Sequence, residues 1–263
     1  MKKIRYTLLT VLVLGMIGLR AQQTPGDKQD ETVTISGATL HLGNGQVIEK
    51  GTIIFSDGIL SEIGTTEEIQ AKGKVIVANG KHVYPGFILP NSSLGLGEID
   101  AVRATRDFDE LGSYLPHVRS VIAYNAESKV VESMRPNGIL LAQVTPRGGR
   151  ISGTSSIVQL DAWNWEDAAV KKDDGIHVNW PNTYQTKYFS FGSVRISGGN
   201  EDYQMQVDEL KDYLIRARAR AYGKNSSPKK RHLPFEAMHG IFSGDARLFI
   251  HAKREKEILD ALD

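Results

Sequence analysis

The sequence predicts an α/β protein in which a small antiparallel β module precedes a larger region of alternating strands and helices. Three observations support this prediction. Residues 33–86 hold short apolar runs separated by Asn-Gly and Asp-Gly pairs, which are turn signals of β-hairpins. Residues 87–170 alternate strand-like apolar runs with helical segments, the pattern of βαβ units. From Tyr203 to Ala221, apolar residues recur at spacings of three and four, which predicts an amphipathic helix.

The composition is that of a globular protein, and it excludes several classes of chemistry. The chain has 263 residues, 40% of them hydrophobic, and a formal net charge of +1. That near-neutral balance gives no electrostatic basis for binding nucleic acid or an anionic membrane surface, so neither partner is expected. The chain has no cysteine, which excludes disulfides, thiolate zinc sites and cysteine nucleophiles.

Residues 1–21 are predicted to be a secretory signal peptide. The basic start MKKIR precedes an apolar run that is too short to span a bilayer comfortably, and Leu19 and Ala21 suit a cleavage site. Residues 22–32 then form a polar, flexible leader. These features predict an exported protein, periplasmic or extracellular, that meets the membrane only through its signal peptide. A buried N-terminal helix or a membrane anchor is the alternative.

Within residues 33–86, each strand is expected between two turn signals. The first strand lies in TVTISGATLHLG, the next two lie in GTIIFSDGILSEIG, and KVIVANGKHVYPG supplies the last two. The turns are expected at Asn44-Gly45, Asp57-Gly58 and Asn79-Gly80. The physical interpretation is a small antiparallel β module.

Later residues give a second series of elements. Buried strands are expected in GILLAQVTP and SSIVQLDA, and a helical segment in HVRSVIAYNAESKVVESMRPNG ends at its Pro-Asn-Gly. Residues 182–200 are expected to form a hairpin or a long loop. LPFEAMHGIFSG predicts a short helix, DARLFIHA a buried strand that ends in His251, and KREKEILDALD a further helix. The run Gly148–Gly153 is expected to be a glycine-rich turn, because it lacks the lysine-serine or lysine-threonine pair of a nucleotide loop.

In this order, the segments resemble the amidohydrolase superfamily and, more narrowly, the imidazolonepropionase-like exported amidohydrolases. The resemblance is carried by VTISGATLHLGNGQVIEKGTIIFSDGILSEIG and KVIVANGKHVYPGFI, and less specifically by GGRISGTSSIVQLD and LFIHAKREKEILDAL. It implies that residues 33–86 form a small β-sandwich module. It also implies that residues 87–263 form a partial TIM-type (β/α) barrel with an inserted loop region around 147–200. By this resemblance the chain is the front half of a longer protein.

The resemblance also implies where metal ligands should lie. The family has two histidines, one residue apart, directly after PGFI on the first barrel strand, and alternate side chains of a strand face the same way. These positions fall on Asn91 and Ser93, whose neutral oxygens are weak zinc ligands. His251 matches the histidine at the end of the fifth strand, a ligand of the second metal. Without the resemblance, His251 is a structural histidine at a strand end.

The implied activity is hydrolysis of a carbon–nitrogen bond other than a peptide bond in a small-molecule substrate. Water activated by zinc or a similar divalent metal would be the nucleophile. The family's remaining catalytic residues would lie beyond Asp263, so none is assigned here, and no hydrolysis is expected of this chain alone. The replaced histidines leave open whether any metal binds. A non-catalytic amidohydrolase-like protein that binds a ligand or a partner is the alternative, and a homo-oligomer is left open.

Overall fold

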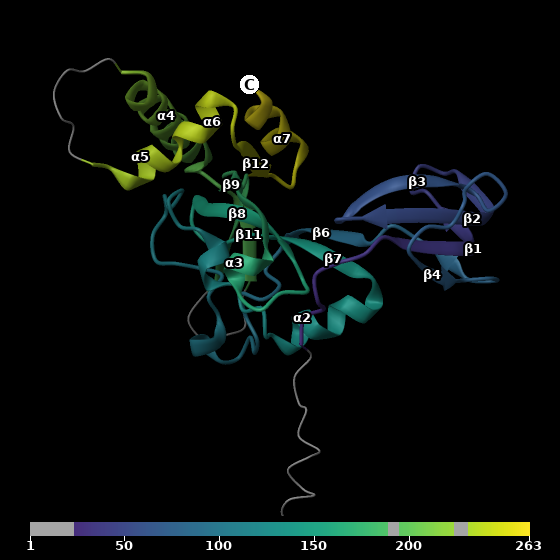
Figure 1. Cartoon of the computed structure of the whole chain (residues 1–263). Helices are drawn as coiled ribbons and strands as arrows, with labels where there is room; N and C mark the ends of the chain where they lie inside the picture. Colours follow the sequence, from purple (N-terminus) through teal and green to yellow (C-terminus); the bar gives the residue numbers. More distant parts are fainter. Residues whose placement is uncertain (1–23, 189–194, 224–230) are drawn as a thin grey trace, which may run out of the picture. The chain divides into compact units, whose positions relative to one another are not determined.

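The computed structural model describes residues 24–188, 195–223 and 231–263, so the predicted signal peptide lies outside the described residues. The chain divides into two units, Met1–Phe87 and Ile88–Asp263 (Figure 1). Both strands and helices are present, which confirms the α/β class. No helix among the described residues is long and apolar enough to cross a membrane.

The first unit is a single five-stranded sheet. Its strands are β1 (Val33–His41), β2 (Val47–Ser56), β3 (Ile59–Thr65), β4 (Lys74–Val77) and β5 (His82–Val83). The strand order is β3-β2-β1-β4, and β5 also pairs with β1. The hairpins β1–β2 and β2–β3 are antiparallel, as the turn signals predict. Within residues 24–87 the structure describes this one sheet rather than the two layers of the implied sandwich.

The expectation of a wholly antiparallel module is wrong for β4 and β5, which both pair in parallel with β1. The cause is the connection after β3, which carries the chain from one edge of the sheet to the other. Gly37 in β1 allows the later turn to fold against the strand. Its φ is +82°, and a Cβ at this position would lie 1.9 Å from Oδ1 of Asn79. A glycine is therefore required at this close approach.

The second unit is built on another five-stranded sheet, ordered β12-β9-β8-β7-β6. Its strands are β6 (Phe87–Ser92), β7 (Ile139–Val144), β8 (Ile151–Gln159), β9 (Ala169–Asn179) and β12 (Arg247–His251). β7, β8 and β9 pair antiparallel, whereas β9 and β12 pair in parallel. The alternation predicted here is therefore wrong for β7 and β8, which form an antiparallel pair without a helix between them, whereas α2 does lie between the neighbouring strands β6 and β7. Because only residues 145–150 join β7 to β8, no crossover helix fits between them.

The helices surround this second sheet. They are α2 (Lys129–Met134), α3 (Trp165–Ala168), α4 (Tyr203–Tyr222), α5 (Leu233–Ala237), α6 (His239–Ser243) and α7 (Glu255–Leu262). The 3₁₀ turns are η1 (Arg103–Thr105), η2 (Ser120–Ala123) and η3 (Arg135–Asn137). The expected helical segment before β7 is interrupted, because Ser128 caps a new helix by accepting hydrogen bonds from the backbone N–H groups of Val130 and Val131. The short helix expected in LPFEAMHGIFSG is divided into α5 and α6.

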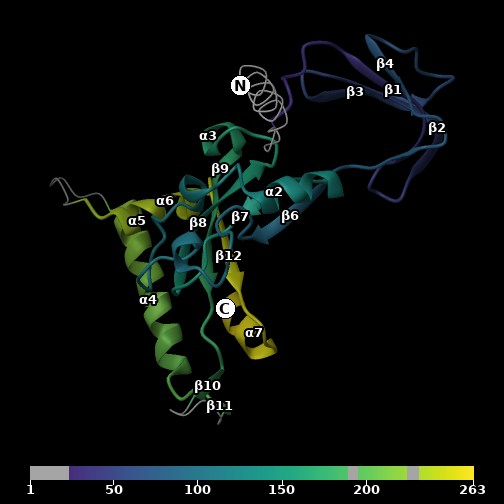
Figure 2. The same ribbon diagram turned by 90° about the horizontal axis from the view of Figure 1, so that it is seen from below.

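Residues expected to form a hairpin or long loop contain the antiparallel pair β10 (Tyr184–Tyr188) and β11 (Arg195–Gly199). The amphipathic helix is confirmed as α4, which runs beside the sheet in Figure 2. Its apolar stripe packs on β8 and β9 in a core of buried residues that includes Ile151, Ile176, Val178, Val207 and Leu210. A second core includes Val121, Val131, Ala142, Val144 and Val158, from η2, α2, β7 and β8. In β7 and β9 the core residues alternate along the strand, so the residues between them face the other side of the sheet.

Candidate functional site

Polar side chains from the strands of the second sheet gather on the face that the apolar cores leave free. In β7, Ala142 and Val144 pack into a core, so Gln143 between them points to the opposite side. In β9, Ile176 and Val178 do the same, so His177 points to the opposite side. Gln143 and His177 are nevertheless buried, at 8% and 1% exposure. This face is therefore a polar interior and not a solvated surface.

Asn91, at the first predicted metal position, is held by Arg147. The guanidinium donates one hydrogen bond to Asn91 Oδ1 (2.5 Å) and another to the Asn91 backbone oxygen (2.6 Å). The backbone N–H of Asn91 donates to Gln143 Oε1 (3.1 Å). The φ of Asn91 is +48°, a left-handed conformation that asparagine tolerates better than most residues. The side-chain oxygen of Asn91 is thus occupied by a cationic group of the protein.

Ser93, at the second predicted position, lies just beyond the end of β6. Its backbone oxygen accepts a hydrogen bond from the N–H of Leu96 (2.9 Å), so it belongs to the turn that follows the strand. The neighbouring Ser92 backbone oxygen accepts from Thr145 N–H (2.7 Å), which joins the end of β6 to the residues after β7.

Gln143 connects Asn91 to a buried carboxylate. Its Nε2 donates to Asp174 Oδ2 (3.0 Å) and lies 3.4 Å from Ser155 Oγ. Asp174 is 3% exposed, and Lys171 Nζ lies 2.7 Å from its Oδ1. A buried charge needs such a partner, because removing it from water is costly. Through the side chain and the backbone of Asn91, Arg147 is therefore connected to Gln143, Asp174 and Lys171 in one continuous chain of polar contacts.

The second feature of the site is a pair of histidines. His177 Nδ1 and His251 Nε2 share a hydrogen bond of 2.8 Å. The His177 ring stacks on Phe249, with ring centroids 4.7 Å apart, and on His251 at 5.1 Å. Gly175 in β9 leaves space for this stack, since a Cβ there would lie 2.5 Å from the Phe249 ring. His177 Nε2 is buried and has no hydrogen-bond partner among the described residues.

Both imidazoles are neutral near neutral pH. Burial lowers the pKa of His177 to about 3, and the nearby His251 and the charge of Arg147 act in the same direction. Burial also lowers the pKa of His251, again helped by Arg147. The charge of Arg147 lowers the pKa of both rings, and Arg147 also binds Asn91, so these four residues lie near one another. The resulting group contains one guanidinium, two neutral imidazoles and two side-chain amides.

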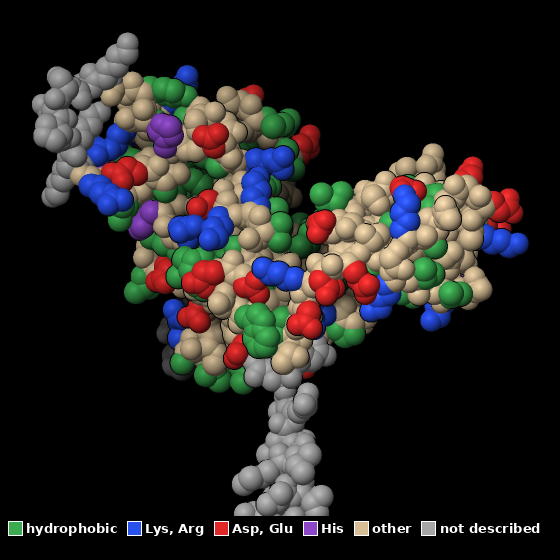
Figure 3. Space-filling model, in the orientation of Figure 1, with side chains coloured by type: hydrophobic (Ala, Val, Ile, Leu, Met, Phe, Trp, Pro, Cys, Tyr) green, Lys and Arg blue, Asp and Glu red, His purple; other side chains and the backbone are tan. Residues whose placement is uncertain are grey.

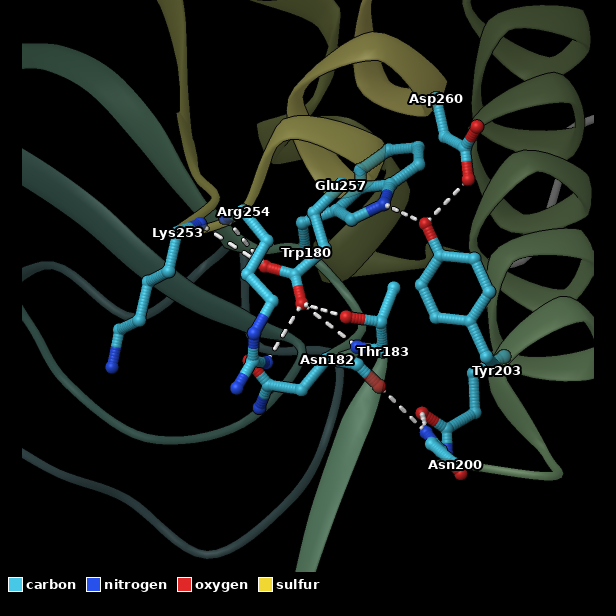
Figure 4. A network of polar contacts seen from close by, with 10 residues as sticks. Trp180, Asn182, Thr183, Asn200, Tyr203, Lys253, Arg254, Glu257 and Asp260 are labelled. Atoms are coloured by element: carbon cyan, nitrogen blue, oxygen red, sulfur yellow. Dashed lines mark hydrogen bonds and ion pairs between the residues drawn. The ribbon is translucent and has the colours of Figure 1, made fainter. Parts of the chain in front are cut away.

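A buried carboxylate fixes the strand ends that carry the histidine pair (Figure 4). β9 and β12 run in parallel, so their carboxyl ends coincide, and Trp180 N–H donates to the His251 backbone oxygen (3.0 Å). Glu257 is fully buried and accepts hydrogen bonds from the backbone N–H groups of Thr183 (2.7 Å) and Lys253 (3.0 Å). It thereby ties the segment after β9 to the segment after β12.

The charge of Glu257 is stabilised by these contacts. Burial alone would raise its pKa, but hydrogen bonds from Thr183, Lys253 and Arg254 lower the pKa of this carboxyl to about 2. Next to it, Trp180 Nε1 donates to the Tyr203 hydroxyl (3.2 Å), which in turn donates to Asp260 (2.6 Å). α7 and α4 are thus linked to the end of β9 by polar contacts.

The metal centre implied by the resemblance does not fit this arrangement. The described residues contain no group of three or more His, Cys, Asp or Glu side chains that could hold a metal ion. At the first predicted metal position, Asn91 Oδ1 accepts a hydrogen bond from the Arg147 guanidinium. The positive charge of Arg147 also opposes a cation beside the two rings. The His251 ring is therefore hydrogen-bonded to another protein side chain, and so is the side chain of Asn91.

Sequence analysis did not identify Gln143, Arg147, Asp174 or His177. One signal for His177 is present in GIHVN, where a histidine alternates with apolar residues in a strand-like run. That pattern predicts a side chain on the opposite face from the core. The approach of these residues depends on the pairing of strands distant in sequence, which no local pattern contains.

Comparison with solved structures shows the fold. The structure is similar to the crystal structure of an amidohydrolase from Thermotoga maritima, with a TM-score of 0.72 and 18% sequence identity. The match covers 88% of this chain and 60% of that chain, so this chain spans less than two thirds of the length of that protein. The chain therefore has the fold of part of a solved amidohydrolase, with its second unit as a curled half-barrel sheet.

Other comparisons add little. A structure of molinate hydrolase is 31% identical over 26% of this chain and 15% of that chain, with a TM-score of 0.23, which is too low to support an argument. No model of a known protein family matches the chain. No curated protein matches it either.

Proposed function

We propose that this protein is an amidohydrolase-type hydrolase for carbon–nitrogen bonds other than peptide bonds, and that the described strands form one wall of its barrel. The observation that supports the proposal most is the fold shared with the Thermotoga amidohydrolase. The site agrees with it, because the histidine pair lies toward the carboxyl ends of the parallel strands β9 and β12, where barrels of this type hold their active sites. The substrate is proposed to be a small molecule.

The finer parts of the proposal follow from the sequence resemblance. They are the imidazolonepropionase-like subtype, a signal peptide, and a periplasmic or extracellular location. In the proposed reaction a divalent metal such as zinc would activate water. The described residues do not supply the ligands for such an ion, and we therefore expect no hydrolysis by this chain on its own.

A second function is favoured by one observation, the Arg147 network. Among the described residues, no carboxylate forms an ion pair with Arg147. Near the Arg147 guanidinium, His177 Nε2 has no hydrogen-bond partner among the described residues, so it offers a bonding position to a polar ligand without metal chemistry. A non-catalytic protein that binds a small amide-containing ligand therefore remains the alternative proposal.

One experiment tests both proposals. The purified chain is mixed, with and without zinc, with a panel of cyclic amides and N-acyl amino acids, and both hydrolysis and thermal stability are measured. We expect no hydrolysis above the buffer rate, and an increase in melting temperature with at least one compound. Replacing Arg147 by alanine is expected to abolish that increase, because the ligand loses its charged donor.

Arg216→Ala is the matched control. Arg216 is an exposed arginine of α4 that pairs with Asp212, and its removal should leave the ligand effect unchanged. A ligand effect that persists in Arg147→Ala contradicts the proposed site. Zinc-dependent hydrolysis would favour the hydrolase over the non-catalytic alternative, whereas a panel in which no compound is either bound or hydrolysed contradicts both proposals.

A further inference from the structure

We propose that His41 and His82, in the first unit, form a surface site for a late first-row transition-metal ion, with copper(II) preferred. The two residues lie outside the site described above, and the proposal is independent of the proposed hydrolase function. It rests on the position of two imidazoles on paired strands and on the separation of their nitrogen atoms.

Strand pairing brings the two histidines together. β1 and β5 run in parallel, with Thr39 opposite His82, so His41 at the end of β1 lies beside the residues of β5. His41 Nε2 and His82 Nδ1 are 3.0 Å apart and share a hydrogen bond. Their ring centroids are 5.2 Å apart. The pair is accessible, since His82 is exposed and His41 is half-buried.

Tyr84 fixes the orientation of the first ring. The His41 and Tyr84 rings are stacked, with centroids 4.2 Å apart and planes 9° from parallel. These two side chains also line an apolar cavity of about 330 Å³, together with Leu40, Leu60 and Val83. The imidazole of His41 is therefore supported on one face and keeps its bonding nitrogen directed toward His82.

The nitrogen separation suits a metal ion. Imidazole nitrogens bind zinc-like ions at about 2.0–2.1 Å, and two adjacent ligands of a square or tetrahedral site are then roughly 2.9–3.4 Å apart. The observed 3.0 Å lies within this range. An ion bound by both nitrogens would lie to one side of the line that joins them, so binding requires each ring to tilt from its hydrogen-bonded orientation and aim its lone pair at the ion. Copper(II) binds such nitrogen sites most strongly in the divalent series, and water would complete its coordination.

This pair differs from His177 and His251 in its surroundings. The buried pair lies within the electrostatic influence of Arg147, which disfavours a cation. The His41–His82 pair has an open side, so that an ion can enter with its remaining water molecules.

The test is a copper(II) titration of the intact chain in competition with a chelator, followed by electron paramagnetic resonance. We expect one equivalent of copper with hyperfine splitting from two imidazole nitrogens. His41→Ala and His82→Ala should each weaken binding by roughly 10- to 100-fold, because the second imidazole acts at high effective concentration once the first is bound. His82→Asn provides a second variant of similar size, and circular dichroism verifies that each variant is folded.

His239→Ala is the control, since it removes one exposed histidine from a different part of the chain and should leave copper affinity unchanged. Copper affinity and spectra that are the same in wild type, His41→Ala and His82→Ala would overturn the proposal. Binding that is lost in His251→Ala and kept in His41→Ala would also overturn it, because the ion would then belong to the buried pair.

Discussion

Acidification from about pH 6.5 to about pH 3 is expected to destabilise the protein through His177, by on the order of 2 to 4 kcal/mol. The ordinary pKa of 6.5 falls to about 3 in the folded protein, mainly because the ring is buried. Below pH 6.5 the unfolded chain binds a proton that the folded chain does not, so the free energy of unfolding decreases as the pH is lowered. Above pH 6.5 the ring is neutral in both states and the penalty disappears. Solvent and protein relax around the charged ring, so the loss of stability is smaller than the full change in the pKa of His177 would give.

The measurement is the free energy of unfolding in denaturant as a function of pH, for wild type and His177→Phe. A phenyl ring preserves the stack on Phe249 and removes the titrating group, so the variant should lose this part of the pH dependence. His239→Phe changes an exposed histidine instead and should retain the wild-type slope. If wild type and His177→Phe lose stability equally over this range, His177 is not the buried neutral ring described above.

Replacing Glu257 by alanine is expected to lower the free energy of unfolding by about 3 kcal/mol or more. The carboxylate is fully buried, and its loss leaves the N–H groups of Thr183 and Lys253 without their acceptor. Since Glu257 joins the segments after β9 and β12, the variant should also disturb Trp180, which lies at the same strand end. Chemical denaturation combined with tryptophan fluorescence measures both effects.

Two further variants make this result specific. Glu255→Ala removes an exposed acidic residue from the first turn of the same helix and should cost far less. Glu257→Gln preserves the shape of the side chain and one hydrogen-bond acceptor. Its free energy of unfolding should lie between those of wild type and Glu257→Ala. The stabilisation by Glu257 should be complete above pH 4.5 and should be lost as pH falls from 4.5 toward about 2, because the folded pKa is the lower one. Equal stabilities of Glu255→Ala and Glu257→Ala would contradict the structural role of Glu257.

Local signals predicted local structure well in this chain. Asn44-Gly45 and Asp57-Gly58 do form antiparallel hairpins, and the stripe from Tyr203 does form the helix α4. The predictions were wrong where they concerned the pairing of strands that are distant in the sequence. The sequence of β4 contains nothing that specifies a parallel partner, and GILLAQVTP and SSIVQLDA fit either a parallel or an antiparallel sheet. The resemblance to amidohydrolases indicated the overall fold but did not supply these pairings.

The same contrast between local signals and distant contacts applies to the candidate site. The resemblance assigned metal positions to Asn91 and His251, and both side chains form hydrogen bonds in the site, Asn91 with Arg147 and His251 with His177. Arg147 directly precedes the glycine-rich run Gly148–Gly153 and belongs to no catalytic motif, and its role depends on reaching back to Asn91, 56 residues earlier. His177 could be placed on a strand from its alternation with apolar residues. Its contact with His251 requires the pairing of β9 with β12, which brings together residues 74 positions apart.

The most direct test of the central claim is the zinc content of the intact chain after equilibration with zinc and removal of free metal, compared between wild type and His251→Ala. We infer that Arg147, bound to Asn91, lies near a hydrogen-bonded pair of neutral imidazoles, His177 and His251, and that this arrangement is not a hydrolytic metal centre. We predict no zinc whose retention depends on His251. One equivalent of zinc in wild type that is lost in His251→Ala would contradict this claim.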